Sequence, residues 1–262
     1  MPWVLRGLRE GVVTTRYPRR DDPYASGFPA RVVPLAPGSP AVAAELEPLC
    51  PTRAITVTDA AVRVDTGRCV LCGRCVRARP DRFGWASGTP TSALSREALV
   101  VPPEEETDEA LTGLRTRLAE RTRRLRRSVH IRHVDAGSDG SEEWEALALL
   151  NPVYDVNRLG IFFTASPRHA DLSLVTGAGT HGMAGPLRRT WEAMPRPVVV
   201  IAAGVDATSG GLTAPGYAVA GGVGGLVDVD VWVPGSPPSP FSLLHGILLA
   251  VGLLPPARSS ER

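Results

Sequence analysis

The chain has 262 residues, 43% of them hydrophobic, and its 29 basic and 27 acidic residues leave a net charge of only +2. The length and apolar content suffice for more than one globular unit, and the near-neutral charge gives no indication of a nucleic-acid partner. No apolar run approaches the roughly 18 residues of a membrane span, and the N-terminus lacks the apolar core of a secretory signal, so we expect a cytoplasmic protein that does not cross a bilayer.

Residues 1–100 form a Pro-rich, irregular first region that contains all four cysteines. We expect this region to be a small α+β domain that depends on a bound metal group. In residues 101–127, leucines recur near helical spacing among many arginines, which predicts a connecting helix.

Residues 128–262 alternate apolar, strand-like runs with helical patterns. Nearly continuous apolar strands that alternate with helices are typical of a parallel sheet covered on both faces. The sequence therefore predicts an open, doubly wound α/β domain. Its predicted strands are 129–134, 161–165, 172–176, 198–203 and 229–233, and its predicted helices are 142–150, 185–194 and 240–253.

The cysteines show a pattern typical of an iron–sulfur site. Cys69, Cys72 and Cys75 form a Cys-x-x-Cys-x-x-Cys run, and Cys50 lies upstream of it. A cubane cluster needs four thiolates around one small volume, and this arrangement can supply them. A zinc site or unrelated free thiols are the alternatives, but the run is atypical of zinc ribbons. The sequence predicts one [4Fe–4S] cluster.

A second cluster in the first region is not expected. The ferredoxin run ends in a fourth cysteine before a proline, but here Arg79 precedes Pro80. Residues 40–49, where the matching upstream cysteines would stand, contain no cysteine. Both halves of a second site are therefore missing.

With Cys50-Pro-Thr-Arg-Ala-Ile and the run from Cys69 to Pro80, residues 1–100 resemble the ferredoxin-like subunits of complex I and of formate hydrogenlyase-type, group 4 [NiFe] hydrogenases. The opening segment from Trp3 to Pro18 looks like the segment with which that family lies along the membrane arm. A short amphipathic helix that packs on its own domain is the alternative.

Residues 128–254 resemble a second family, the small subunit of group 4 hydrogenases and the B-type subunit of NADH–quinone oxidoreductase. This resemblance implies a flavodoxin-like α/β fold, and the two resemblances together imply a fusion of two normally separate subunits. The second resemblance is carried by Ser128-Val-His-Ile-Arg-His-Val-Asp-Ala-Gly-Ser138, Asn151-Pro-Val-Tyr-Asp155, the segment from Gly160 to Asp171, Leu174-Val-Thr-Gly177 and Val233-Pro-Gly-Ser-Pro-Pro238.

The second family holds a proximal [4Fe–4S] cluster on four cysteines, whose positions are here Asp139, Glu142, Asp206 and Ser236. Oxygen ligands are poor substitutes at a soft iron–sulfur site, so we expect this cluster to be absent. These residues could instead bind a hard cation such as Mg²⁺. The favoured alternative is that they are solvated or hydrogen-bonded loop residues.

The resemblances imply a non-catalytic electron-transfer subunit of a membrane-associated oxidoreductase of the complex I or group 4 hydrogenase type. Its expected partners are a hydrogenase large subunit or complex I D-type subunit and the membrane-arm subunits, which would hold it on the inner face of the cell membrane. Arg168 and His169 stand where the resembled family meets the large subunit, although local loop hydrogen bonding is an alternative.

Two other functions remain open at this point. The chain could be a structural or regulatory paralogue that docks a large subunit without passing electrons through the vacated proximal site. It could also be a free-standing ferredoxin with a flavodoxin-like module that binds FMN.

Overall fold

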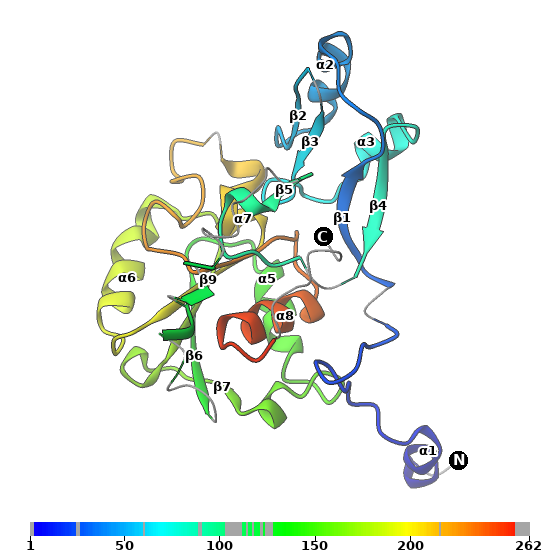
Figure 1. The fold of residues 1–262 in the computed structure, drawn as a ribbon. Helices are drawn as coiled ribbons and strands as arrows, with labels where there is room; N and C mark the ends of the chain where they lie inside the picture. The colour runs from blue at the N-terminus through cyan, green and yellow to red at the C-terminus, as the bar shows by residue number, and fades with distance from the viewer. Residues whose placement is uncertain are drawn as a thin grey trace.

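The structure is a computed structural model in which an α/β unit carries a smaller cysteine-containing region on one side (Figure 1). Among the described residues, no helix is both long and apolar enough to cross a bilayer. The described residues are 3–24, 27–59, 61–88, 91–102, 112–113, 115–116, 118–120, 123, 128–214 and 216–254.

A five-stranded sheet in the order β10-β9-β8-β6-β7 forms the centre of the α/β unit. Every neighbouring pair in it is parallel. Counted from the first strand of this unit, the order is 2-1-3-4-5, which is that of flavodoxin-like folds. The strands are β6 (Val129–Asp135), β7 (Ile161–Phe163), β8 (Leu172–Thr176), β9 (Val199–Ala203) and β10 (Val231–Val233).

Helices cover both faces of this sheet because alternate residues of each buried strand point to opposite sides. Leu174 and Ile201 belong to the core shared with α5 (Ser141–Ala148) and α8 (Pro240–Ala250). Val175, Val200 and Ala202 face the second core, which includes Leu187 of α6 (His181–Glu192). The predicted doubly wound α/β unit is therefore confirmed.

The elements differ from the sequence prediction mainly at their ends. α6 begins at His181 rather than residue 185, and Pro186 lies inside it rather than near its start. A short helix, α7 (Val205–Ser209), follows β9 and was not predicted. Its five residues are too few to show a helical period.

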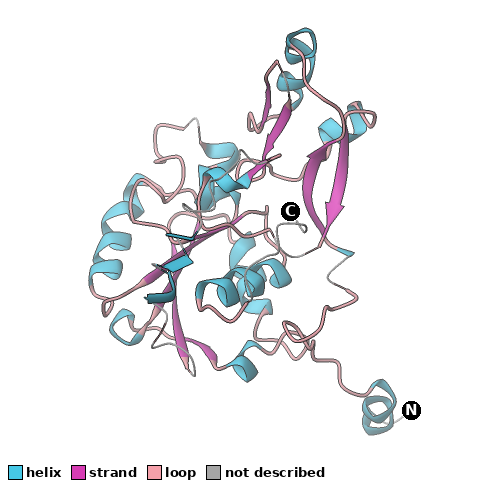
Figure 2. Cartoon of the chain, in the orientation of Figure 1, coloured by secondary structure: helices cyan, strands magenta, loops and turns pink. Residues whose placement is uncertain are grey.

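The first region contains two small antiparallel sheets joined by short helices, so it is mixed α and β (Figure 2). Its own apolar core includes Val32, Leu46 and Phe83. The sheets are β1 (Pro29–Pro34) with β4 (Phe83–Ser87), and β2 (Ile55–Val57) with β3 (Val62–Asp65) and β5 (Val100–Val101); the helices are α1 (Trp3–Glu10), α2 (Pro40–Leu46), α3 (Arg74–Ala78) and the 3₁₀ turns η2 (Glu47–Leu49) and η3 (Glu97–Leu99).

Aromatic residues of the first region insert into the core of the α/β unit. Tyr17 and Phe28 lie against Phe241 of α8 with ring centroids 6.4 and 6.1 Å apart. The Tyr17 hydroxyl is also 2.6 Å from Nδ1 of His245. The first hundred residues are thus anchored to the α/β unit by buried side chains.

The predicted connecting helix over residues 101–127 lies largely outside the described residues. Those described between 112 and 120 are helical. Leu118, one of them, packs in the main core.

We expect Phe241→Ala to lower the free energy of unfolding by about 3–5 kcal/mol, because it would leave a cavity under Tyr17 and Phe28. Urea unfolding of anaerobically purified protein measures the effect. Phe162, which is 38% exposed, provides the control, and Phe162→Ala should cost less than about 1.5 kcal/mol. Equal losses of unfolding free energy in the two variants would contradict the prediction that Phe241 anchors Tyr17 and Phe28 in the core.

Candidate metal centre

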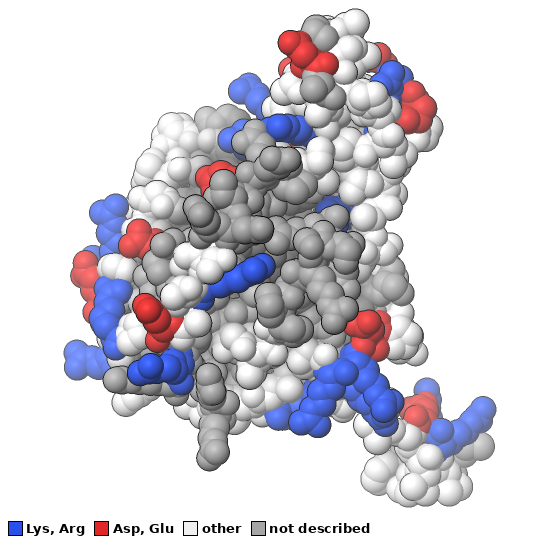
Figure 3. Space-filling model, viewed as in Figure 1, with Lys and Arg blue, Asp and Glu red and all other residues white. Residues whose placement is uncertain are grey.

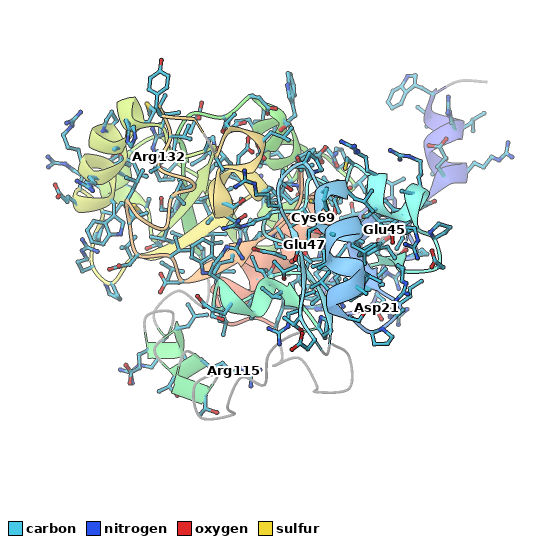
Figure 4. The ribbon with its side chains drawn as sticks, turned by 90° about the horizontal axis from the view of Figure 1, so that it is seen from above. Asp21, Glu45, Glu47, Cys69, Arg115 and Arg132 are labelled. Atoms are coloured by element: carbon cyan, nitrogen blue, oxygen red, sulfur yellow. The ribbon has the colours of Figure 1, made fainter. Side chains whose placement is uncertain are left out.

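The four cysteines line one pocket of the first region. All four are free thiols; Cys69 is buried and Cys72 is exposed. Figure 4 labels Cys69 in the part of the first region that faces the α/β unit. The remaining lining is mostly apolar, and it consists of Val32, Leu49, Pro51, Ala54, Ile55, Val64, Val70, Gly73 and Arg74.

A tight loop brings three of these thiols together. Cys69 ends a turn that follows β3, and Cys75 lies in the first turn of α3. Between them, Leu71 and Gly73 have φ values of 51° and 68°. A left-handed conformation is costly for leucine and persists only where its surroundings impose it, which is common at binding sites.

Backbone amides point at the sulfur atoms. The amide of Ala54 donates to Cys50 Sγ at 3.2 Å, and amides of Leu71 and Val76 hydrogen-bond to the thiols of Cys69 and Cys75. Such donors stabilise negative charge on sulfur and are among the features that set the potential of iron–sulfur clusters.

Burial raises the pKa of the Cys69 thiol to about 12, and burial also raises the pKa of Cys75. The neighbouring thiols contribute to both rises, because like charges would lie close together if the thiols were ionised. The thiolate form at this pocket therefore needs a positively charged partner, and a bound metal group would supply one.

The arrangement of the thiols bears on which metal group the pocket could hold. Among the described residues, no three His, Cys, Asp or Glu side chains lie close enough together to hold one metal ion. A zinc ion would draw all its sulfur ligands to about 2.3 Å from one point. A cubane would let each thiolate bind a different iron, and four thiols that line one pocket could supply these ligands.

Four further positions are those where the resembled family has cysteines, namely Asp139, Glu142, Asp206 and Ser236. They follow the carboxyl ends of β6, β9 and β10, so the parallel sheet brings them to one edge, which we call the substituted edge. Asp139 is exposed and accepts hydrogen bonds from the Ser141 amide and hydroxyl at 2.9 and 2.6 Å. Ser236 is also exposed. The β9 and β10 loops touch here, because the Val205 amide donates to the Gly235 carbonyl at 2.8 Å.

Glu142 is only 2% exposed and fills the space beside Gly204. Gly204 has φ 93°, and a Cβ there would lie 2.4 Å from Glu142 Oε1. Burial is the main cause that raises the pKa of Glu142 to about 7, and the nearby charges of Asp206 and Asp139 contribute to this rise. Burial, and then Asp139, also raise the pKa of Asp206.

These carboxylates do not form a cation site among the described side chains. The hard-cation alternative therefore gains no support from the geometry. Glu142 occupies the space with its own side chain, and Ser141 Oγ lies 3.1 Å from its Oε2.

A neighbouring network was not anticipated from the sequence. Glu143 accepts hydrogen bonds from Ser138 Oγ at 2.7 Å and from the Thr176 hydroxyl, and Thr176 Oγ1 is 2.9 Å from His133 Nε2. The network fastens α5 to β6 and β8. No sequence signal links these residues, because only the sheet register brings His133 and Thr176 together.

One other sequence-based expectation concerns an arginine and a histidine. Arg168 and His169 lie in the turn η5 (Pro167–His169), and both are exposed, as a partner contact requires.

Near the cysteine pocket, the Arg79 side chain forms hydrogen bonds with Asp81 at 2.8–2.9 Å and with Glu45. These acids offset the charge of Arg79, whereas Arg74 lines the pocket itself.

Comparison with known proteins places the α/β unit among redox-complex subunits. Residues 140–250 match the family described as NADH ubiquinone oxidoreductase, 20 Kd subunit. Formate hydrogenlyase subunit 7 of Escherichia coli is 38% identical over 159 residues, which are 61% of this chain and 61% of that protein. This chain thus spans less than two thirds of that relative.

Two further proteins extend the comparison. The probable membrane-bound hydrogenase subunit mbhJ of Pyrococcus furiosus is 35% identical over 156 residues, which cover 56% of this chain and 93% of that protein. A chain in the structure of the membrane-bound sulfane sulfur reductase (MBS), an archaeal respiratory membrane complex, is 28% identical, with a TM-score of 0.43. The match covers 53% of this chain and 77% of that one.

The raised pKa of Glu142 predicts the direction in which its contribution to stability changes with pH. Its folded pKa of about 7 lies above the ordinary 4.5, so the stability that it contributes is full below pH 4.5 and is lost as the pH rises through 7. The free energy of unfolding of Glu142→Gln, relative to that of wild type, should therefore rise by about 1–3 kcal/mol between pH 4.5 and about pH 8.

Asp139→Asn is the matched control, measured by urea unfolding at the same two pH values. Hydrogen bonds from Ser141 lower the pKa of Asp139, so its contribution is present above its ordinary pKa and is lost in acid. Between pH 4.5 and about pH 8, Asp139→Asn should therefore stay parallel to wild type, because Asp139 titrates below its ordinary pKa of 3.8. A pH profile for Glu142→Gln parallel to wild type would refute a buried carboxylate with a raised pKa.

Proposed function

The chain belongs to the NADH ubiquinone oxidoreductase 20 Kd subunit family, and from this premise we propose that it is an electron-transfer subunit of a membrane-associated oxidoreductase carrying one [4Fe–4S] cluster. The cluster ligands are Cys50, Cys69, Cys72 and Cys75. One observation carries the proposal: every cysteine of the chain lines the same pocket.

When bound, such a cluster accepts and releases one electron at a time. The residues of the pocket supply the ligands and the surroundings. The thiols bind iron, the amides of Ala54, Leu71 and Val76 donate to sulfur, and the apolar lining limits the access of water to the inner sulfur of Cys69. Cys72, which is exposed, provides the edge nearest to an external redox partner.

We assign residues 1–100 to a ferredoxin-like unit, residues 101–127 to a connector and residues 128–262 to the family unit. The family match covers residues 140–250 and so leaves the four cysteines outside it. The separate sheets and the separate apolar core of the first region support a fusion of two units.

We further propose that Asp139, Glu142, Asp206 and Ser236 hold no second cluster. Three carry oxygen-rich carboxylates and one a hydroxyl, which are hard ligands. Glu142 also fills part of this edge with its own side chain.

The substituted edge favours a second candidate function. A chain without thiolates there could dock a large subunit as a structural or regulatory paralogue and pass no electrons through that edge. The reducible cluster at the four cysteines distinguishes the two functions, because a purely structural subunit has no need of it.

The proposed partners are a hydrogenase large subunit or complex I D-type subunit, which Arg168 and His169 would contact, and membrane-arm subunits. One relative is named as a membrane-bound hydrogenase subunit, in keeping with a place on the inner face of the cell membrane. The helix α1 projects from the body (Figure 1), and Trp3, Leu5 and Leu8 are 84%, 52% and 76% exposed. Arginines also gather beside it, as Figure 3 shows; those lining a shared hollow are Arg16, Arg19, Arg20 and Arg158.

Anaerobically purified protein should contain about four iron and four sulfide ions per chain and give one S = 1/2 EPR signal after reduction with dithionite. Cys72→Ala removes one ligand and should abolish or strongly weaken that signal. Ser236→Ala, which removes a hydroxyl from the substituted edge, should leave it intact. About eight irons per chain would contradict the single cluster.

The pocket arginine should raise the reduction potential of the cluster, because a nearby positive charge stabilises the more negative, reduced state. Arg74→Gln should therefore lower the potential by roughly 20–60 mV in an EPR-monitored redox titration. Arg79→Gln is the control and should shift it much less, because Asp81 and Glu45 already offset the charge of Arg79. Equal shifts of the potential in the two variants would contradict the claim that Asp81 and Glu45 offset the charge of Arg79.

A further inference from the structure

Arg96 links the turn that leads into Cys69 to the α/β unit. Arg96, which lies between β4 and β5, donates from both terminal nitrogens to the two carboxylate oxygens of Asp65, at 2.8 Å each. The two side chains are only 23% and 19% exposed. A bidentate, mostly buried arginine–carboxylate pair fixes geometry as well as charge.

The same guanidinium reaches the α/β unit. Its Nε donates to the backbone carbonyl of Thr208 at 3.3 Å, and Thr208 lies in α7. All three nitrogens of Arg96 are therefore used, two within the first region and one across to α7. A lysine could not reproduce this planar arrangement.

A second hydrogen bond returns from α7 to the cysteine turn. The Thr208 hydroxyl lies 2.6 Å from the Gly67 carbonyl, and the Thr208 side chain is buried. Gly67 itself has no room for a side chain, since a Cβ there would lie 2.8 Å from Arg96 Cζ and from a methyl of Leu99. Arg96 and Thr208 thus hold the turn in place, and we call their contacts with Asp65 and Gly67 the Arg96 clamp.

The clamp is close to the proposed ligands on one side and to the substituted edge on the other. Gly67 is two residues before Cys69, and the Cys69 amide donates to the carbonyl of Thr66 at 3.3 Å. Thr208 is two residues after Asp206. The Asp65 carboxylate also accepts the Gly67 amide at 2.9 Å, so the ion pair orders the turn directly.

We propose that Arg96 is a positioning residue that locks the Cys69–Cys75 loop to α7 through Asp65, Gly67 and Thr208, so that the cysteine region and the α/β unit move as one redox unit. The inference rests on the proposed cluster at the four cysteines. It adds that the cluster is held against the carboxyl edge of the parallel sheet, beside Asp206, rather than on a separately moving domain.

Hydrogen exchange by mass spectrometry on the anaerobic, cluster-loaded full chain tests the proposal. In Arg96→Gln, amide exchange should accelerate about tenfold both in residues 66–76 and in residues 204–210, because one clamp protects both segments. Arg96→Lys should restore only part of the protection. Arg82→Gln, which alters an arginine bonded to Pro37 and Asp81 in the same region, should leave both segments unchanged.

A spectroscopic readout separates positioning from general stability. Loosening the loop should broaden the EPR line of the reduced cluster in Arg96→Gln but not in Arg82→Gln. If Arg96→Gln does not load iron, Thr208→Val provides the comparison, since it removes the hydroxyl bonds to the carbonyls of Gly67 and Val205 and keeps the ion pair. In that variant the exchange of both segments should also accelerate.

The outcomes also separate this proposal from the proposed function. Wild-type protein without iron would refute the cluster itself. Iron-loaded variants with unchanged exchange in both segments and an unchanged EPR line, or with acceleration in only one segment, would overturn the clamp while leaving the cluster in place.

Discussion

The parallel pairing of all five strands of the large sheet is the constraint on which the functional geometry depends. Because every strand ends at the same edge, residues that follow β6, β9 and β10 meet there although they are far apart in the sequence. Asp139, Glu142 and Asp206 influence one another's ionisation for this reason. The same edge offers α7, through Thr208, as a support for the turn before Cys69. The carboxyl edge of the sheet therefore carries the substituted positions and also supports the turn that leads into the cysteine pocket.

The α/β unit was predictable because its signals are local. The strands β8 and β9 are buried throughout, so they read as continuous apolar runs, and the sequence located both within one residue. The helix α6 was placed four residues late because Pro186, which usually marks a helix start, stands inside it. The helix α7 could not be found because its five residues contain no complete apolar period. Tyr17 and Phe28 gave no sign that they insert beside Phe241, since that contact depends on tertiary packing.

The candidate site was only partly predictable. The spacing of the cysteines indicated their chemistry, and the structure places all four thiols around one pocket. Sequence could not show that Arg79 is engaged by Asp81 and Glu45, nor that Arg74 faces the pocket, because both depend on how α3 packs. It also could not reveal the burial of Glu142, which requires the absence of a side chain at Gly204. The Arg96 clamp joins residues that are more than a hundred positions apart.

Native mass spectrometry of the anaerobically purified full chain tests the central claim most directly, because it counts intact clusters on each molecule. The account predicts a single species heavier than the bare chain by one [4Fe–4S] unit, and loss of that added mass in a variant with Cys69 and Cys72 both changed to alanine. A species carrying two clusters would contradict the account at Asp139, Glu142, Asp206 and Ser236. A bare chain or a single bound zinc ion would contradict it at the four cysteines.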